Sequence, residues 1–338
     1  MADARHFLLT SLLRDVSRSF YLTLRILPAS IREPIGLAYL LARTTDTIAD
    51  AGQALLEQRL EALQKLSERI EARSQEAVDL SALARQQKIP AERVLLENCE
   101  ESLALLHQLS ASDRQLVRDV LLTIVSGQQL DLRRFAGASE KRVIALRTDA
   151  ELDDYTYRVA GCVGEFWTKM CRAHLFPRAS LDEVALLANG IRFGKGLQLV
   201  NVLRDLPADL RRGRCYLPAE ALAKERLEPG SLLDPGNEQQ SRPVYNRWID
   251  QAEAHLTAGW RYTNTLPRRC VRLRLACAWP LLIGQETVKL LRSGRVLDPS
   301  RRIKVGRPRV RSILCRSVLY YPWPGAWYRL FQPSPSIS

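Results

Sequence analysis

Apolar residues recur along the chain at the three- and four-residue spacing of helices, and no segment shows the alternation typical of β-strands. The pattern predicts helices over residues 4–24, 34–50, 56–70, 94–107, 112–135, 152–173, 181–206, 244–265 and 271–291. Residues 228–243 hold three prolines and two glycines among polar side chains, so we expect a surface loop there. Helices flank this loop on both sides, which favours a single all-α domain over residues 1–291, followed by a tail over 292–338.

The predicted helix over residues 34–50 is aliphatic on most of its circumference, yet it carries two aspartates. Asp46 and Asp50 lie four residues apart, so both project from one face, about 6 Å apart along the axis. Arg43 extends the same polar stripe. Because unpaired buried carboxylates are costly, this stripe must face polar groups or a cation.

The predicted helix over residues 181–206 carries a second polar stripe. Gln198, Asn201, Asp205 and Asp209 are spaced by three, four and four residues, which keeps them in a narrow sector of one helix. Pro207 removes a backbone donor, so we expect the helix to kink or end between the two aspartates. Carboxylates on two aliphatic helices favour Mg²⁺, which takes oxygen ligands and is commonly held by one or two carboxylates together with substrate phosphates.

Arginines accompany both stripes, and their guanidinium groups suit bidentate binding of phosphate. They are Arg18, Arg43, Arg204, Arg212 and Arg214. Carboxylates, Mg²⁺ and arginines together describe a diphosphate site. The alternative is a solvated helix face with i,i+4 ion pairs, which is the more common use of a single D-x-x-x-D spacing.

The tail carries most of the net charge of +13. Residues 292–338 hold ten basic residues and one acid, together with aromatic residues such as Trp323 and Trp327. This combination predicts peripheral contact with the anionic inner face of a membrane. A tail packed on its own domain is the alternative. We expect no nucleic-acid partner, because the sequence has no recognisable nucleic-acid module and the rest of the chain is nearly balanced in charge.

The remaining composition narrows the setting. Seven scattered cysteines without a C-x-x-C pair suit a reducing cytoplasm. No run of about 18 apolar residues predicts a membrane-spanning helix. The four histidines are dispersed and predict neither a metal site nor a catalytic triad.

Five segments combine the polar stripes with further residues in a fixed order. They are Ser17-Arg18-Ser19-Phe20, Tyr39-x-x-x-Arg43-x-x-Asp46-x-x-x-Asp50, Tyr155-Thr156-Tyr157-Arg158-Val159-Ala160-Gly161-Cys162-Val163-Gly164, Gln198-x-x-Asn201-x-x-Arg204-Asp205-x-x-x-Asp209 and Arg212-Gly213-Arg214-Cys215-Tyr216-Leu217-Pro218. In order and spacing, the set resembles the squalene/phytoene synthase family over residues 10–290. The resemblance implies an isoprenoid-synthase helical bundle around a central cavity, with the two aspartate motifs on opposite walls.

The resemblance also implies residue roles by position. It assigns Mg²⁺ binding to Asp46, Asp50, Asp205 and Asp209. It assigns binding of substrate diphosphate or nicotinamide-cofactor phosphates to Arg18, Arg43, Arg204 and Arg214, with Gln198 and Asn201 beside the metal. Tyr155 is assigned to proton removal; a buried tyrosine bonded to the backbone is the alternative. Ala49 stands where eukaryotic members carry an acid, so we expect water to replace one metal ligand there.

The implied activity is the head-to-head joining of two farnesyl diphosphates through presqualene diphosphate, and NADPH reduction to squalene is the expected second step. Arg302-Ile303-Lys304 resembles the basic stretch that holds NADPH in squalene synthases. Phytoene or dehydrosqualene synthesis without NADPH is the first alternative, and a non-catalytic membrane-bound helical protein is the second. Chain-elongating prenyltransferases use D-D-x-x-D, whereas Thr45 precedes Asp46 here. The sequence does not indicate an oligomeric state.

Overall fold

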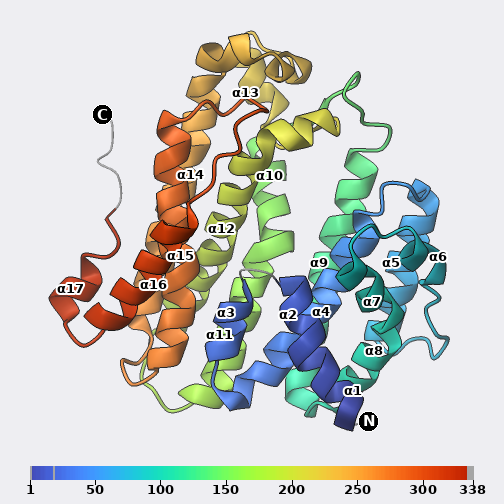
Figure 1. Ribbon diagram of the computed structural model, residues 1–338, viewed down its shortest axis with the longest axis vertical. Helices are drawn as coiled ribbons and strands as arrows, with labels where there is room; N and C mark the ends of the chain where they lie inside the picture. The colour runs from blue at the N-terminus through green and yellow to red at the C-terminus, as the bar shows by residue number, and fades with distance from the viewer. Residues whose placement is uncertain (1, 18–19, 333–338) are drawn as a thin grey trace. The chain divides into compact units, whose positions relative to one another are not determined.

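The computed structural model describes residues 2–17 and 20–332, which form mostly helices (Figure 1). The chain folds into two compact units. One comprises Met1–Arg133 with Phe166–Ala179, and the other comprises Arg134–Glu165 with Ser180–Ser338. The all-α prediction is confirmed. The predicted division into residues 1–291 and 292–338 is not tested by this grouping and stays a prediction.

The first unit is built on helix α4 and the helices around it. Its elements are α1 (Ala2–Phe7), a π-helix (Leu8–Leu12), α2 (Leu13–Ser17), α3 (Tyr21–Ile26), α4 (Ala29–Ala49), α5 (Leu56–Ile70), α6 (Ser81–Arg85), α7 (Pro90–Glu97), α8 (Cys99–Gln108), α9 (Ala111–Arg134), whose last residue belongs to the second unit, and the part of α11 (Cys162–Leu175) from Phe166 onward. Leu40, Leu41 and Leu63 are fully buried in its core. The apolar spacing read from the sequence therefore marks the faces by which these helices pack.

The second unit is built on three long helices, α12, α14 and α15. Its elements are α10 (Asp149–Thr156), a π-helix (Tyr157–Gly161), the start of α11 (Cys162–Leu175), α12 (Glu183–Arg211), α13 (Ala219–Lys224), two 3₁₀ turns (Pro229–Leu233 and Pro235–Asn237), α14 (Glu238–Thr265), α15 (Val271–Ser293), α16 (Arg307–Tyr320) and α17 (Pro324–Tyr328). The short strands β1 (Ile144–Ala145) and β2 (Arg214–Cys215) pair in parallel.

Helices α12 and α14 pack along their length, and α15 lies beside them (Figure 1). The buried Tyr245 on α14 donates its hydroxyl hydrogen to the carbonyl oxygen of Leu203 on α12, at 2.9 Å. Gly196 lets the two backbones approach, since a Cβ there would lie 2.9 Å from the Cβ of His255. These contacts hold the polar stripe of α12 on a rigid support.

Two glycines also bring the backbone around α11 against α12. A Cβ on Gly164 would lie 1.9 Å from the carbonyl oxygen of Gly190, and one on Gly194 would lie 2.0 Å from that of Ala160. Backbone oxygens cannot rotate away as a side chain can, so any larger residue must force the two segments apart.

Replacing Gly164 with alanine is therefore expected to lower the free energy of unfolding by about 1–3 kcal/mol or more, because the added methyl overpacks this contact. Urea denaturation followed by far-UV circular dichroism measures the change. Gly230→Ala is the control, since nothing lies within 4 Å of the position of its added Cβ. Equal urea midpoints for the two variants would contradict the prediction.

Several predicted helix boundaries were wrong. Within the range 4–24, the described residues form α1, a π-helix and α2 up to Ser17, and then α3 from Tyr21 onward. The predicted surface loop over 228–243 instead contains two 3₁₀ turns and the first turns of α14, with Pro243 inside the helix. Helix α12 passes through Pro207 and continues to Arg211, so Asp209 lies on it.

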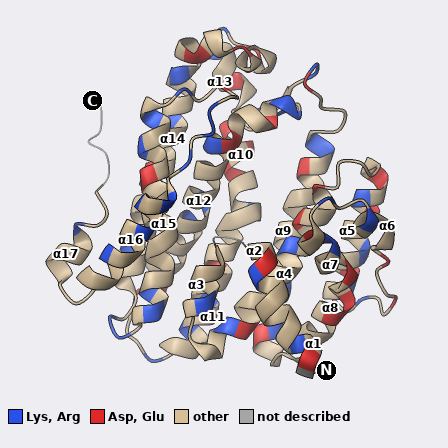
Figure 2. Cartoon of the chain, viewed as in Figure 1, with Lys and Arg blue, Asp and Glu red and all other residues tan. Residues whose placement is uncertain are grey.

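The tail is helical over α16 and α17 and belongs to the second unit. Figure 2 shows Lys and Arg along α16 and at the nearby turn between α14 and α15. Trp327 and Phe331 are buried, so part of the tail packs on its own domain. No helix in the part of the chain that the structure describes combines the length and hydropathy required to cross a bilayer. Contact with a membrane surface stays a prediction.

Candidate active site

The first aspartate motif closes helix α4 in the first unit. Asp46 lies in the last turn, and Asp50 follows as the C-cap residue, with its backbone N–H donating to the Asp46 carbonyl oxygen at 2.8 Å. The guanidinium of Arg43 lies 3.9 Å from the Asp46 carboxylate and donates to Glu92 of α7 at 2.6 Å. The side-chain amide of Gln128, on α9, donates to the Asp46 carboxylate at 2.5 Å.

The Asp46 carboxylate binds its proton more tightly than an ordinary aspartate. Desolvation and the negative charge of Asp50 raise its pKa from 3.8 to about 6, against the opposing effects of Arg43 and Gln128. The side chain of Asp46 keeps 49% of its exposure, so water screens part of this cost. Two carboxylates with insufficient neutralisation form a site that a cation would stabilise.

Asp46→Asn is expected to raise the melting temperature of the metal-free protein at pH 8. An aspartate with a raised folded pKa binds more protons in the folded than in the unfolded state between pH 3.8 and about 6, so stability falls as pH rises through this window. Asparagine keeps the contact with Gln128 and has no charge. Differential scanning fluorimetry in EDTA should show a gain at pH 8 that disappears near pH 4. The control is Asp119→Asn, on an exposed position of α9; an equal gain in this variant would contradict the prediction.

Sequence reasoning missed the contributions of α9 and α7 to this motif. Gln128 and Asp131 are buried and lie three residues apart on α9, and the Oε1 atom of Gln128 has no hydrogen-bond partner among the described residues. Because Gln128 and Asp131 lie three residues apart within an aliphatic segment, their spacing could have indicated a polar stripe on this helix. The contact of Gln128 with Asp46 could not be read from the sequence, because the two residues lie 82 positions apart in the chain.

The second aspartate motif lies on α12 in the second unit. The guanidinium of Arg204 donates to both carboxylate oxygens of Asp205, at 3.0 and 2.5 Å. One turn further on, Asp209 lies 3.9 Å from the guanidinium of Arg212. Asp205 and Asp209 lie on one side of α12 because residues four apart share a helix face. Asp182 caps the first turn of this helix by accepting from the backbone N–H of Ala185.

Tyr155, on α10, joins the stripe on α12. The side-chain amide of Gln198 donates to the Tyr155 hydroxyl oxygen at 3.3 Å, and the Asn201 amide donates to Gln198 at 3.5 Å. The Tyr155 ring lies 4.6 Å from that of Tyr216. The Tyr155 hydroxyl therefore contacts a polar side chain of the motif, and its assignment to proton removal stays a prediction.

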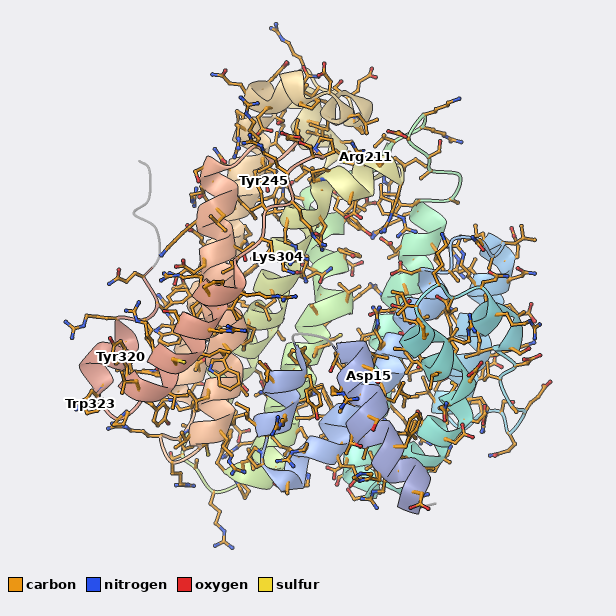
Figure 3. The ribbon with its side chains drawn as sticks, viewed as in Figure 1. Asp15, Arg211, Tyr245, Lys304, Tyr320 and Trp323 are labelled. Atoms are coloured by element: carbon orange, nitrogen blue, oxygen red, sulfur yellow. The ribbon has the colours of Figure 1, made fainter. Side chains whose placement is uncertain are left out.

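The turn after α12 positions the arginines that follow the motif. Gly213 has a φ of +80° and a Cβ there would lie 2.1 Å from the backbone nitrogen of Ser139, so the turn requires glycine. Beyond it, Arg214 begins β2, and its guanidinium lies 5.8 Å from the centre of the Phe135 ring. Figure 3 labels Arg211 at the end of α12 that leads into this turn.

The two basic residues assigned to NADPH lie on the extended segment between α15 and α16. Arg302 and Lys304 are exposed there, and Figure 3 labels Lys304. Glu238 anchors the segment by accepting from the backbone N–H groups of Val296 and Leu297, at 3.1 and 2.8 Å. Arg18, the remaining predicted phosphate ligand, lies outside the described residues.

Comparison with known proteins decides the family. The model of the squalene/phytoene synthase family matches residues 13–309. The chain belongs to the squalene/phytoene synthase family. This membership makes it an enzyme, a prenyltransferase of isoprenoid biosynthesis, within a family that joins prenyl diphosphates head to head.

Individual relatives agree with this squalene/phytoene synthase assignment. The presqualene diphosphate synthase of Rhodopseudomonas palustris is 28% identical over 299 residues, covering 88% of this chain and 91% of the relative. The enzyme of the same name from Sinorhizobium fredii is 30% identical over 258 residues, covering 75% and 77%. The solved complex of TcSQS with the ligand BPH1237 superposes with a TM-score of 0.75 at 21% identity, covering 97% of this chain and 89% of that one. This structural likeness confirms the isoprenoid-synthase fold.

The donor set of this squalene/phytoene synthase fits Mg²⁺. Within the described residues, no group of three or more His, Cys, Asp and Glu side chains gathers into a metal site, and each aspartate motif offers two carboxylates. Mg²⁺ requires oxygen ligands, keeps several waters and accepts substrate phosphate oxygens, so few protein carboxylates suffice. Family members are generally Mg²⁺-dependent. The individual ligand assignments to Asp46, Asp50, Asp205 and Asp209 stay predictions.

Proposed function

We propose that this protein joins two farnesyl diphosphates head to head to form presqualene diphosphate, with Mg²⁺ as cofactor. The observation that carries the proposal is the stripe on α12, where Asp205 lies against Arg204 and Gln198 is bonded to Tyr155. A carboxylate beside an arginine suits a metal-bound diphosphate, since the carboxylate can bind the metal and the arginine can bind the phosphate oxygens. A phenol held next to them by a neutral amide matches a group that handles a proton near the reacting carbons.

In the proposed reaction, the C1–O bond of one farnesyl diphosphate breaks and the diphosphate leaves with the electron pair. Arg204 binds the departing charge, while bound Mg²⁺ would neutralise the diphosphate oxygens. The double bond of the second substrate attacks the allylic cation, and loss of one proton closes a cyclopropane ring. The hydroxyl oxygen of Tyr155 accepts a hydrogen bond from Gln198 and is the group we assign to guide this proton away. Aliphatic neighbours of the stripe on α12 limit the access of water to the cation.

Reduction of presqualene diphosphate to squalene by NADPH is the second candidate. It is favoured by the basic residues Arg302 and Lys304, which lie exposed on an anchored segment where they can meet phosphate groups. Against it, the matched relatives from Rhodopseudomonas palustris and Sinorhizobium fredii are named for presqualene diphosphate alone. Phytoene or dehydrosqualene synthesis, without NADPH, is the remaining alternative.

Product analysis tests these proposals. Purified protein is incubated with farnesyl diphosphate and Mg²⁺, with and without NADPH, and the products are separated by chromatography and mass spectrometry. Presqualene diphosphate in both reactions supports the first proposal, and squalene only with NADPH supports the second. Dehydrosqualene as the only product, or phytoene from geranylgeranyl diphosphate with farnesyl diphosphate unused, would reject both.

A further inference from the structure

Two segments of the second unit are basic and contain no acidic residue. The segment over residues 254–285 holds five arginines and neither Asp nor Glu: Arg261, Arg268, Arg269, Arg272 and Arg274. After Asp298, the chain holds eight basic residues and no acid: Arg301, Arg302, Lys304, Arg307, Arg309, Arg311, Arg316 and Arg329. The first segment forms the end of α14, its turn into α15 and the first half of α15.

The structure joins these two segments at one end of the second unit. The guanidinium of Arg268, in the α14–α15 turn, donates to the carbonyl oxygen of Pro322 at 2.6 Å. In return, the hydroxyl of Tyr321 donates to the carbonyl oxygen of Arg268 at 2.5 Å. The α14–α15 turn and the connection between α16 and α17 therefore form one continuous surface, although about 50 residues separate them in the chain.

The inner side of this end is anchored by aromatic packing. Trp327 is 2% exposed, and its ring lies 5.3 Å from that of Trp260. Its indole N–H donates to the side-chain oxygen of Asn264 at 2.7 Å, and the guanidinium of Arg274 lies over the same ring. These contacts fix which side of the α16–α17 segment is covered by the domain.

The outer side leaves large apolar residues in solvent. Trp323 and Leu319 are 59% and 60% exposed, and Val271 in the neighbouring turn is exposed as well. Arg316 lies over the Tyr320 ring. Figure 3 labels Tyr320 and Trp323 at this end of the second unit, and Figure 2 shows basic residues beside them. Exposed tryptophan and leucine among arginines match a bilayer interface, where the rings lie at headgroup depth and the charges meet anionic lipids.

We propose that this surface, the arginine–tryptophan face (Arg268, Arg269, Arg272, Arg316, Leu319 and Trp323), binds the surface of an anionic phospholipid bilayer. Charge complementarity selects the occupant, because the two segments offer only positive charge. The exposed side chains of Leu319 and Trp323 can insert into the apolar part of a bilayer. They would add little to the affinity for a nucleic acid. The proposal gives the predicted membrane contact a definite orientation, and it includes a turn that lies outside the tail.

Vesicle sedimentation of the full-length protein, without substrate, tests the proposal. Binding is expected to vesicles of phosphatidylcholine with 30% phosphatidylglycerol, to weaken in 0.5 M NaCl, and to be absent with phosphatidylcholine alone. Replacing Arg268, Arg269 and Arg272 together by glutamine should lower partitioning by about 100-fold, since each charge near the surface contributes about fivefold. The matched control neutralises three exposed bases elsewhere, Lys88, Arg178 and Lys224. Equal losses in the two triple variants would overturn the proposal, because net charge alone would then explain binding.

A second variant pair tests insertion. Leu319→Ser with Trp323→Ser should weaken binding at least about tenfold, while Leu55→Ser, at another exposed leucine, should not. Unchanged binding of the double variant would overturn insertion. A change in its oligomeric state by light scattering, with vesicle binding unaltered, would assign the face to a second copy of the chain. Stronger retention by duplex DNA than by anionic vesicles would assign it to nucleic acid. Turnover is assayed separately in detergent without vesicles, so failure of the reaction and failure of docking are distinguishable.

Discussion

Replacing Asp205 with asparagine is expected to lower kcat by about 10³-fold, because the reaction would lose a carboxylate that we assign to Mg²⁺ binding, where negative charge develops on the leaving diphosphate. The substitution preserves size, and the amide oxygen can still accept a hydrogen bond from Arg204. Steady-state kinetics with farnesyl diphosphate over a range of Mg²⁺ concentrations measures both kcat and the half-saturating Mg²⁺ concentration, and the latter should rise.

Asp250→Asn is the matched control for this experiment. Asp250 is an exposed carboxylate on α14, paired with Arg292, and belongs to neither aspartate motif. It should leave kcat within about twofold of the wild-type value. Thermal melts followed by circular dichroism verify that both variants fold. If Asp205→Asn kept more than a fifth of the wild-type kcat, the assignment of this residue to the metal would be wrong.

Replacing Trp327 with alanine is expected to cost about 3–5 kcal/mol of stability, the usual loss for a buried tryptophan. The ring is stacked on Trp260, and its N–H is bonded to Asn264. Urea denaturation should show a lower midpoint. Limited trypsin digestion should cleave sooner within α16, where Arg311 and Arg316 become accessible when the segment detaches.

Trp323→Ala is the control, because it removes the same type of side chain from an exposed position instead of a buried one. Trp323 lies four residues before Trp327 and is 59% exposed, so its replacement should change stability by less than about 0.5 kcal/mol. Trp327→Phe keeps the stacked ring but not the N–H donor, and it should fall between the two. Equal urea midpoints for Trp323→Ala and Trp327→Ala would show that the tail does not contribute to the stability of the second unit.

Helical periodicity predicted the framework of the fold because each long helix buries a continuous stripe. It failed where local chemistry opposed the pattern. Pro207 predicted a kink or an end in the helix, and α12 does not end there but continues to Arg211. A proline inside a helix costs one hydrogen bond and some strain, which packing of α12 on α14 offsets. The tail was also incompletely predicted, since composition cannot indicate that Trp327 is buried and Trp323 is exposed.

The candidate site was predictable only where its residues share one helix. The spacing of Asn201, Asp205 and Asp209 places them on one face without further information. The contact of Gln128 with Asp46 depends on tertiary packing of α9 and could not be derived from spacing. Tyr155 was found through resemblance to the family, and its contact with Gln198 gives that assignment a physical partner.

The pairing of Arg204 with its neighbour Asp205 has a consequence for how ligands bind. While the arginine donates to both carboxylate oxygens, two of its N–H donors and one lone pair on each oxygen are not available to ligands. A metal ion that takes the carboxylate releases the guanidinium for diphosphate, and diphosphate that takes the guanidinium exposes the carboxylate to metal. Each ligand thereby removes a competitor of the other, so their affinities are thermodynamically linked, and by reciprocity each must strengthen the other by the same factor.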